Sequence, residues 1–201
     1  MTKQYSDTMR NAILTPYEAT LGTSPKCRIY TGTQPATVAT AASGTQLWEG
    51  SASSDWLTSP SGGTASLIGT FSGTVSVDGT AGYYRLLTSG GTAHEQGSIT
   101  RAFSLSTSAS TSAGSNVLTF TSTTGVVDGQ SISGTGVPSG AVVLSHTSTT
   151  VTMSGASSAG VSSSTAIYFG DTSGDLWLNS TALTASQVLT INVLTRTAPG
   201  A

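Results

Sequence analysis

The sequence predicts a mainly β protein: an antiparallel β-sandwich or barrel host domain with one N-terminal helix and a small inserted β module. Short runs in which apolar and polar residues alternate recur along most of the chain, and Gly, Ser, Asp or Pro bounds nearly every run. Only one segment has helical spacing. Short, closely spaced strands with almost no helix are typical of antiparallel architectures and disfavour a parallel α/β fold.

The one helix is expected near the N-terminus. Ser6 or Asp7 can cap its start, and Gly22 follows its last turn. Apolar residues recur along it at every fourth position, at Met9, Ile13, Tyr17 and Leu21. Pro16 lies inside this segment and is expected to kink the helix or end it early.

After Gly22 the period of the pattern changes to two, which predicts strands. KCRIYT (26–31) places Cys27 and Ile29 on one face. Further strands are expected in GTFSGTVSV (69–77), GYYRLL (82–87), SITRAFSLS (98–106), DLWLNS (175–180) and QVLTINVLTR (187–196). The last run is the clearest, because Leu189, Ile191 and Val193 alternate with the residues between them. LWEGSASSDWLTSP (47–60) is expected to contain few strands.

The middle of the chain differs in composition. STSASTSAGS (106–115) has the composition of a spacer, and SGASSAGVSSST (154–165) is a second low-complexity tract. Five short strands are expected between and around them, in NVLTFTS, QSISG, GAVVLSHTS, TVTMSG and TAIYFG. The pattern predicts a small β module at 115–169, inserted into a loop of a host domain formed by 1–114 and 170–201.

The Gly-rich stretch GVVDGQSISGTGVPSGAVV (125–143) invites comparison with phosphate-binding loops. Gly134, Gly136 and Gly140 are spaced one residue too far apart for a dinucleotide fingerprint, and Ala141 stands where a Walker loop needs Lys. The following residues continue as a strand, whereas phosphate binding requires a helix to begin there. The stretch is therefore predicted to be a turn between strands.

Composition narrows the possible partners. Charged residues make up 8% of the chain, the net charge is −2, and the 7 Lys and Arg are spread thinly, so no basic stripe exists for nucleic acid. The N-terminal segment lacks the apolar stretch of a secretion signal, and no apolar run is long enough to cross a membrane. The single cysteine, Cys27, excludes an intrachain disulfide and is expected to be buried in a strand.

No catalytic, cofactor-binding or metal-binding residues are predicted, so the chain is not expected to be an enzyme. No G-x-S-x-G motif is present, and His94 and His146 fall in separate modules. His94 and Glu95 do not form an H-E-x-x-H motif, and the acidic residues are too scattered to suggest a glycosidase pair. DTSGD (171–175) begins like a calcium loop but lacks the closing Glu, so a hairpin turn is expected there.

The tryptophans are the candidate anchors for a partner. A role in the core is expected for Trp48, Trp56 and Trp177, and both faces of the strand that carries Trp177 are expected to pack. Contact with a partner is the alternative, because Trp offers a large area at low entropic cost. The candidate interface residues are Trp48, Trp56, Met9 and Arg10.

Four segments of the host domain match the pattern of a known family. They are TMRNAILTPYEATLGTSPKCRIYTGTQPA (8–36), SGTQLWEGSASSDWLTSPSGG (43–63), GTAGYYRLLTSGGTAHEQGSIT (79–100) and GDLWLNSTALTASQVLTINVLTRTAPGA (174–201). In order and character they resemble the capped helix, G-T-S-P turn, G-T-A-G-aromatic-R strand and terminal G-D-L strand pair of small β-rich virion structural proteins of tailed bacteriophages. The insert is similar to a small β repeat of phage structural proteins. Pro16 and the weakly apolar segment before Asp55 depart from the family pattern.

The resemblance implies a capsid decoration or cement protein that stabilises the phage head through many weak surface contacts. Its partners would be the major capsid protein or other virion proteins, with self-association, for example as a trimer. The protein would be assembled in the host cytoplasm and reside in the virion, without a cofactor, nucleic acid or membrane partner, and the insert would project outward.

Three alternatives remain open on the sequence. The chain could be a tail, baseplate or fibre component, or a carbohydrate-binding module on the virion that uses Tyr and Trp faces. An enzyme acting on host polysaccharide is the third, and the scattered carboxylates disfavour it.

Overall fold

The computed structural model describes residues 3–200 and confirms a mainly β fold with antiparallel sheets and one helix within those residues. The chain divides into two compact units. The first comprises Met1–Ile99 and Thr181–Ala201, and the second comprises Thr100–Ser180. Each unit has its own buried side chains and is described by itself below.

The bounds of the units differ from the predicted module bounds of 115 and 169. The tract 106–115 packs against the second unit: Thr107 Oγ1 donates to Ser162 O at 2.7 Å, and the Thr111 amide donates to Val161 O at 2.7 Å. Both threonines are buried. A segment rich in Ser, Ala and Thr can be a flexible linker or an ordered part of a folded unit. Composition alone therefore did not show that 106–115 belongs to the second unit.

The helix α1 spans Asp7–Leu21 and begins at the predicted cap, because the Ser6 side chain accepts a hydrogen bond from the Met9 amide. Pro16 lies inside α1, so the expectation that it would end the helix early is wrong. Tertiary packing holds the last turn: Leu21 is buried, and Trp56 Nε1 donates to Gly22 O at 3.1 Å.

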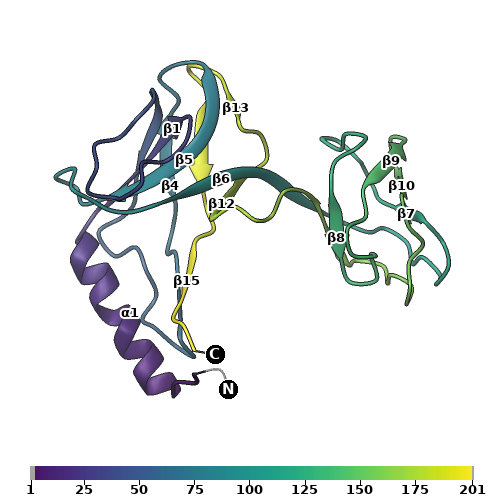
Figure 1. Cartoon of the computed structure of the whole chain (residues 1–201), viewed down its shortest axis with the longest axis horizontal. Helices are drawn as coiled ribbons and strands as arrows, with labels where there is room; N and C mark the ends of the chain where they lie inside the picture. Colours follow the sequence, from purple (N-terminus) through teal and green to yellow (C-terminus); the bar gives the residue numbers. More distant parts are fainter. Residues whose placement is uncertain (1–2, 201) are drawn as a thin grey trace. The chain divides into compact units, whose positions relative to one another are not determined.

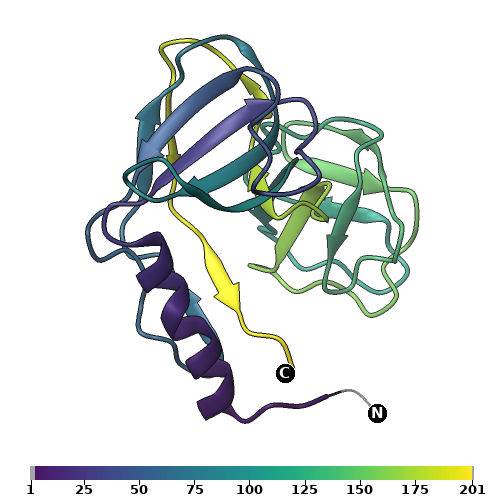
Figure 2. The ribbon, with the colours of Figure 1, turned by 60° about the vertical axis from the view of Figure 1, so that its left-hand side comes forward.

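Only the second half of the predicted stripe of α1 is covered, because Leu21 is buried and Tyr17 is partly buried. Met9 is 51% exposed and Ile13 is also exposed, whereas Leu14 is buried against Ala65 and Ala198. Ala65 lies in β3 (Thr64–Ser66), and Ala198 directly follows the C-terminal strand β15 (Thr195–Thr197). α1 runs beside these two segments (Figures 1 and 2). α1 carries apolar residues on the side of Met9 and Ile13 and on the side of Leu14. The side of Leu14 is buried because Ala65 and Ala198 pack against it.

The first unit is built on an antiparallel sheet of order β14-β4-β2-β1-β5-β6, with β13 paired to β5. β15 and β3 form a separate two-stranded sheet. Its strands are β1 Lys26–Thr31, β2 Gln46–Ser51, β3 Thr64–Ser66, β4 Phe71–Thr74, β5 Gly79–Leu87, β6 Ala93–Ser106, β13 Ala182–Leu183, β14 Val188–Ile191 and β15 Thr195–Thr197. β6 continues into the second unit. Large fully buried side chains fill this core, including those of Ile29, Leu47, Trp48, Trp56, Phe71 and Tyr83.

Strand β2 lies in the middle of this sheet, paired with both β1 and β4, although the segment 47–60 was expected to contain few strands. Two consecutive residues of β2, Leu47 and Trp48, are both buried, so the strand lacks the alternation that predicts a half-buried strand. Cys27 is a free, buried cysteine in β1, as predicted, and burial raises the pKa of its thiol.

The run QVLTINVLTR forms two strands instead of one. β14 pairs with β4 so that Ile191 lies opposite Phe71, whereas β15 pairs with β3 so that Thr195 lies opposite Ser66. The register therefore shifts by one residue between the two ladders, which moves alternate side chains to the other face. Leu194 is buried as a result, and Val193 is exposed.

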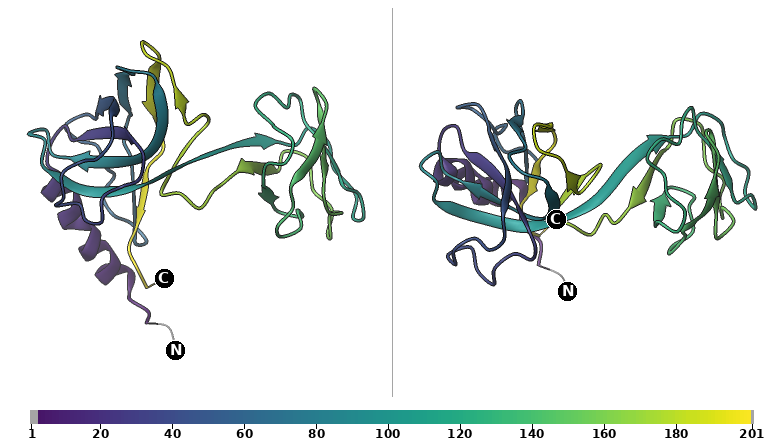
Figure 3. Two further views of the ribbon diagram at one scale, coloured as in Figure 1. Left: turned by 45° about the horizontal axis from the view of Figure 1, so that its top comes forward. Right: turned by 90° about the horizontal axis from the view of Figure 1, so that it is seen from above.

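The second unit contains one strand in each of the five predicted segments (Figure 3). Its strands are β7 Val117–Thr119, β8 Ile132–Gly134, β9 Val143–His146, β10 Thr150–Met153, β11 Ala166–Gly170 and β12 Leu176–Leu178. The end of β6 pairs with β11, β11 pairs with β8, and β7, β10 and β9 form a second small sheet. The core between them includes Leu118, Phe120, Ile132, Val151, Met153, Ile167 and Phe169.

The Gly-rich stretch forms the connection between β8 and β9, as predicted. Gly134, Gly136 and Gly140 all have positive φ. At Gly136 a side chain is also excluded by space, because a Cβ atom there would lie 2.2 Å from Gly160 O. Positive φ accounts for all three glycines, and close packing within the second unit adds to this at Gly134 and Gly136.

Candidate functional site

The four predicted interface residues lie in different environments. Trp48 and Trp56 are fully buried inside the first unit, which confirms the expected core role for both. Arg10 is buried and pairs with Asp7 at 3.5 Å. Met9 is the one member of the set whose side chain is exposed.

The exposed apolar residues of the first unit include a group at one edge of its sheet. β14 has β4 as its strand partner within the described chain. Val188 at the start of β14 is 68% exposed, and Val193 just beyond its end is 71% exposed. Leu67 N donates to Leu194 O at 2.8 Å, which places the exposed Ile68 beside Val193. We call β14 with the side chains of Ile68, Val188 and Val193 the edge surface.

The edge surface also offers backbone groups. The Val75 amide donates to Gln187 O at 2.8 Å, and this bond sets the phase of the ladder between β14 and β4. In an antiparallel ladder only alternate residues bond to a given neighbour. The N–H and C=O groups of Val188 and Thr190 therefore point away from β4 and are available to another strand.

Nothing in the sequence of the edge surface protects it from pairing. Edge strands of monomeric proteins are usually blunted by charged residues, Pro or bulges. No charged residue stands between Asp175 and Arg196 in the sequence, and β14 contains no Pro. The Arg196 side chain is largely buried and pairs with Glu95, so its charge does not protect the strand edge. The edge surface is thus an uncharged, apolar strand edge.

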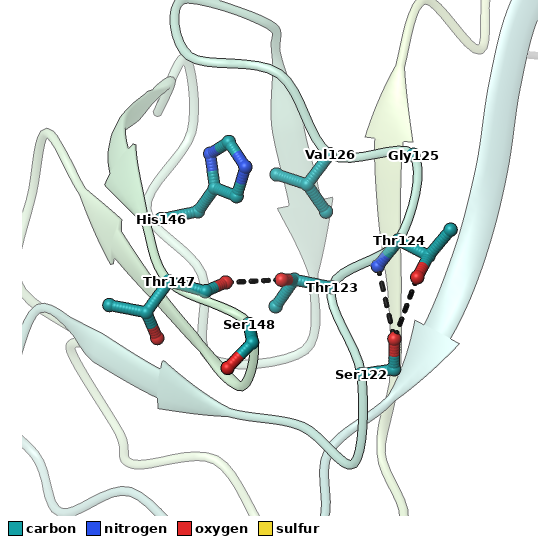
Figure 4. Close-up of a pocket in the computed structure, with 8 residues that line it drawn as sticks. All are labelled: Ser122, Thr123, Thr124, Gly125, Val126, His146, Thr147 and Ser148. Atoms are coloured by element: carbon teal, nitrogen blue, oxygen red, sulfur yellow. Dashed lines mark hydrogen bonds between the residues drawn. The ribbon is translucent and has the colours of Figure 1, made fainter.

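A hydroxyl-rich cleft of about 480 Å³ lies in the second unit (Figure 4). Its walls are the loop after β7 and the turn between β9 and β10, and its lining is Ser122, Thr123, Thr124, Gly125, Val126, His146, Thr147 and Ser148. Part of this lining is committed to internal bonds. Thr123 Oγ1 donates to Thr147 O, and Ser122 Oγ lies 2.9 Å from Thr124 Oγ1.

His146 in this cleft is paired with a carboxylate. Its Nδ1 lies 2.7 Å from Asp128 Oδ1, an arrangement that fixes the orientation of an imidazole in many active sites. A nucleophile within reach of the ring would be needed for such chemistry, and Figure 4 shows the ring turned away from the hydroxyls of Ser122 and Ser148. Within residues 3–200 no three His, Cys, Asp or Glu side chains come together to hold a metal. The pair instead ties the loop before β8 to the end of β9.

No signal in the sequence indicates the pairing of Asp128 with His146, because the two residues are 18 positions apart. His94 and His146 do lie in separate units, as predicted, and His94 is exposed. The segment DTSGD connects β11 to β12. There the Ser173 amide donates to Asp171 Oδ1 at 2.8 Å, and hydrogen bonds from Ser173 hold the pKa of Asp171 below its usual range.

A buried polar cluster joins α1 to three strands of the first unit. Glu95 on β6 accepts hydrogen bonds from Tyr17 on α1 and from Tyr84 on β5, the latter at 2.7 Å. Arg196 on β15 pairs with Glu95, and its Nε donates to Tyr17 at 3.0 Å. Burial and the charge of Glu95 raise the pKa of Tyr17, so its hydroxyl stays protonated and donates. The polar groups of the cluster bind one another through hydrogen bonds and an ion pair. We therefore interpret the cluster as structural: it links α1 to β5, β6 and β15.

An exposed aromatic pair lies on the second unit. Trp177 is 43% exposed and meets the ring of Tyr168 edge-on, with 5.9 Å between ring centroids. The expectation of a core role for Trp177, with both faces of β12 packed, is therefore wrong for this residue. Its indole is held in place because Nε1 donates to Gly174 O at 3.0 Å. Exposed Ser104 and Ser133 lie opposite Tyr168 on the two neighbouring strands.

No protein-family model matches this sequence, and no curated protein or solved structure matches it significantly. The resemblance to phage virion proteins therefore rests on the sequence segments alone. A search of residues 3–200 found no helix long and apolar enough to span a membrane. Among the described residues, the edge surface and the aromatic pair are exposed candidates for binding a partner.

Proposed function

We propose that this chain is a structural protein of a tailed-phage particle, a capsid decoration protein that binds neighbouring virion proteins, further copies of itself included, through the edge surface. The observation that carries the proposal is the uncharged, apolar edge of β14. A partner strand added to this edge would use the free backbone groups of Val188 and Thr190 and would cover Val188 and Val193. A tail, baseplate or fibre position would use the same surface.

The mechanism is association by many weak contacts. A single added strand gives modest affinity, and repetition over an assembled lattice multiplies it. With only 8% charged residues, the chain has little electrostatic contribution to lose as salt increases. This combination suits a protein that must stay bound to a particle under varied ionic conditions.

Replacing Val188 and Val193 together by Lys is expected to weaken self-association by about tenfold or more, because lysine on a strand edge opposes strand addition. Sedimentation velocity over a range of protein concentrations measures the effect. Leu144→Lys is the matched control: Leu144 is also exposed and apolar but lies in the second unit. Equal weakening by both variants, or a wild-type protein that stays monomeric at every concentration, would count against self-association through this surface.

The aromatic pair supports a second candidate, a carbohydrate-binding role for the second unit. Sugars present an apolar C–H face and a rim of hydroxyls. The exposed Trp177 ring, and Ser104 and Ser133 on either side of its neighbour Tyr168, offer the complementary groups. This role is compatible with a place on a virion, where the second unit would meet the host surface.

Trp177→Ala is expected to weaken glycan binding by about tenfold, as the loss of one aromatic contact, whereas Trp177→Phe retains most of it. The measurement is a glycan array followed by a fluorescence titration of the best ligand. Trp177 is exposed while Trp48 and Trp56 are buried, so a ligand-dependent change reports on Trp177. A wild-type protein that binds no glycan would dispose of this candidate and leave the structural proposal intact.

A further inference from the structure

A row of polar side chains crosses four neighbouring strands of the first unit. The strand register places Glu49 of β2 opposite Arg28 of β1, Arg28 opposite Arg85 of β5, and Arg85 opposite Gln96 of β6. Residues directly opposite each other in neighbouring strands share one face of the sheet. Two arginines are therefore adjacent on this face, an arrangement that is destabilising unless their charges are balanced.

The charges in this row are not balanced. Glu49 pairs with Arg28 at 2.5 Å and with Lys26 at 3.2 Å, so its carboxylate is shared between two cations. No carboxylate among residues 3–200 pairs with Arg85. Its Nη2 donates to two neutral acceptors, Thr40 O at 2.7 Å and Gln96 Oε1 at 3.0 Å.

Arg85 is nevertheless buried, with 5% of its surface exposed. Its Nε is shielded from solvent and has no acceptor within the described chain, and both of the hydrogen bonds just described use Nη2. Taking a guanidinium out of water without a counter-charge costs several kcal/mol. The pattern is that of a cation placed to receive an anion.

A cavity of about 340 Å³ adjoins the two arginines. Arg28, Tyr30 and Arg85 form its charged and aromatic wall, and the loop 38–42 lines another side with Val38, three alanines and Thr40. This volume is at the lower end of the range for small-ligand sites. The cavity thus combines a cationic donor, Arg85, with a wall that is mostly apolar.

We propose that this cavity binds a carboxylate attached to a short apolar group, with Arg85 as the main donor and Arg28 beside it. The guanidinium of Arg85 can donate to the carboxylate through Nη1, which makes none of the hydrogen bonds described above. A single negative charge balances the one arginine that lacks a partner, and the wall at 38–42 covers the apolar part. The carboxylate can belong to a free small acid or to the C-terminus of a peptide, because both present the same group. The inference is independent of the proposed assembly function.

A calorimetric titration of the protein with butyrate tests the site directly. Saturable binding of butyrate is expected, with no binding of butanol, which has the same apolar body without the charge. Arg28→Gln is expected to weaken butyrate binding about tenfold, the typical effect of removing one charged hydrogen-bond donor. Arg28 is partly exposed and its loss leaves Arg85 in place, so the variant is expected to fold. Arg101→Gln removes an arginine of the second unit and is expected to leave binding unchanged.

A second experiment distinguishes the two possible sources of the carboxylate, a free small acid and the C-terminus of a peptide. A tripeptide ending in Ala-Ala is compared with the same peptide carrying an amidated C-terminus. Binding of butyrate and of the free peptide supports the site for either source, and binding of the free peptide alone assigns it to a protein C-terminus. The proposal is overturned if neither ligand binds, if butanol or the amidated peptide binds equally well, or if Arg28→Gln and Arg85→Gln both fold and leave the affinity unchanged.

Discussion

Glu95→Gln is expected to lower the free energy of unfolding of the first unit by about 3 kcal/mol, because it leaves Arg196 inside the protein without a counter-charge. The side chains of Glu95 and Arg196 are only 21% and 17% exposed, so water screens their interaction weakly. The substitution keeps the size of the side chain and removes its charge. It also weakens the acceptor for Tyr17 and Tyr84, the contacts that link β6 to α1 and β5.

Urea unfolding followed by tryptophan fluorescence measures this effect, since Trp48 and Trp56 are buried in the first unit. Glu49→Gln is the matched control. Glu49 also pairs with two cations, Lys26 and Arg28, but all three side chains are more exposed than those of the buried cluster. Its loss is expected to cost about 0.5 kcal/mol. A Glu95→Gln variant as stable as Glu49→Gln would show that the buried cluster does not hold the helix to the sheet.

Phe169→Ala is expected to lower the free energy of unfolding of the second unit by about 4 kcal/mol. Phe169 is fully buried and packs between two rings, with centroid distances of 5.5 Å to Phe103 and 5.6 Å to Phe120. Removing it leaves a cavity at the centre of a small core. Tyr168→Ala, on the same strand but the opposite face, is the control and is expected to cost about 1 kcal/mol.

Hydrogen exchange read by mass spectrometry locates the effect of Phe169→Ala. Faster exchange is expected in β8, β10 and β11, while the protection of β1 and β2 stays the same, because the core around Phe169 contains only residues of the second unit. Equal loss of protection in both units would contradict two separate cores.

Local pattern predicted the strands well where apolar and polar residues alternate in the sequence and turn residues bound the run. KCRIYT forms β1 with the predicted bounds, and each predicted strand of the insert exists. Both predictions depend only on neighbouring residues, because alternation and turn residues are local features of the sequence. Cys27 and the Gly-rich turn between β8 and β9 followed from the same local reasoning.

Features that depend on distant partners were not predictable from one sequence. The buried face of α1 is chosen by Ala65 and Ala198, and the break between β14 and β15 comes from a register shift against β4 and β3. β2 was missed because a central strand can bury consecutive side chains.

The candidate site was predicted less well than the fold. Trp48 and Trp56 are both buried, and the edge surface could not be found before the strand order placed β14 at the edge of the sheet. Its only sequence signal is the absence of charge between Asp175 and Arg196. The row from Glu49 to Gln96 likewise depends on the register between strands.

Electron cryomicroscopy of particles of a phage that encodes this chain is the most direct test of the proposed structural role. We expect ordered copies of the first unit in which neighbouring protein covers β14, Val188 and Val193. Copies tiled on the icosahedral lattice would support capsid decoration, and copies at the tail would support the alternative position. Particles that lack the chain, or copies whose β14 edge faces solvent, would contradict the account.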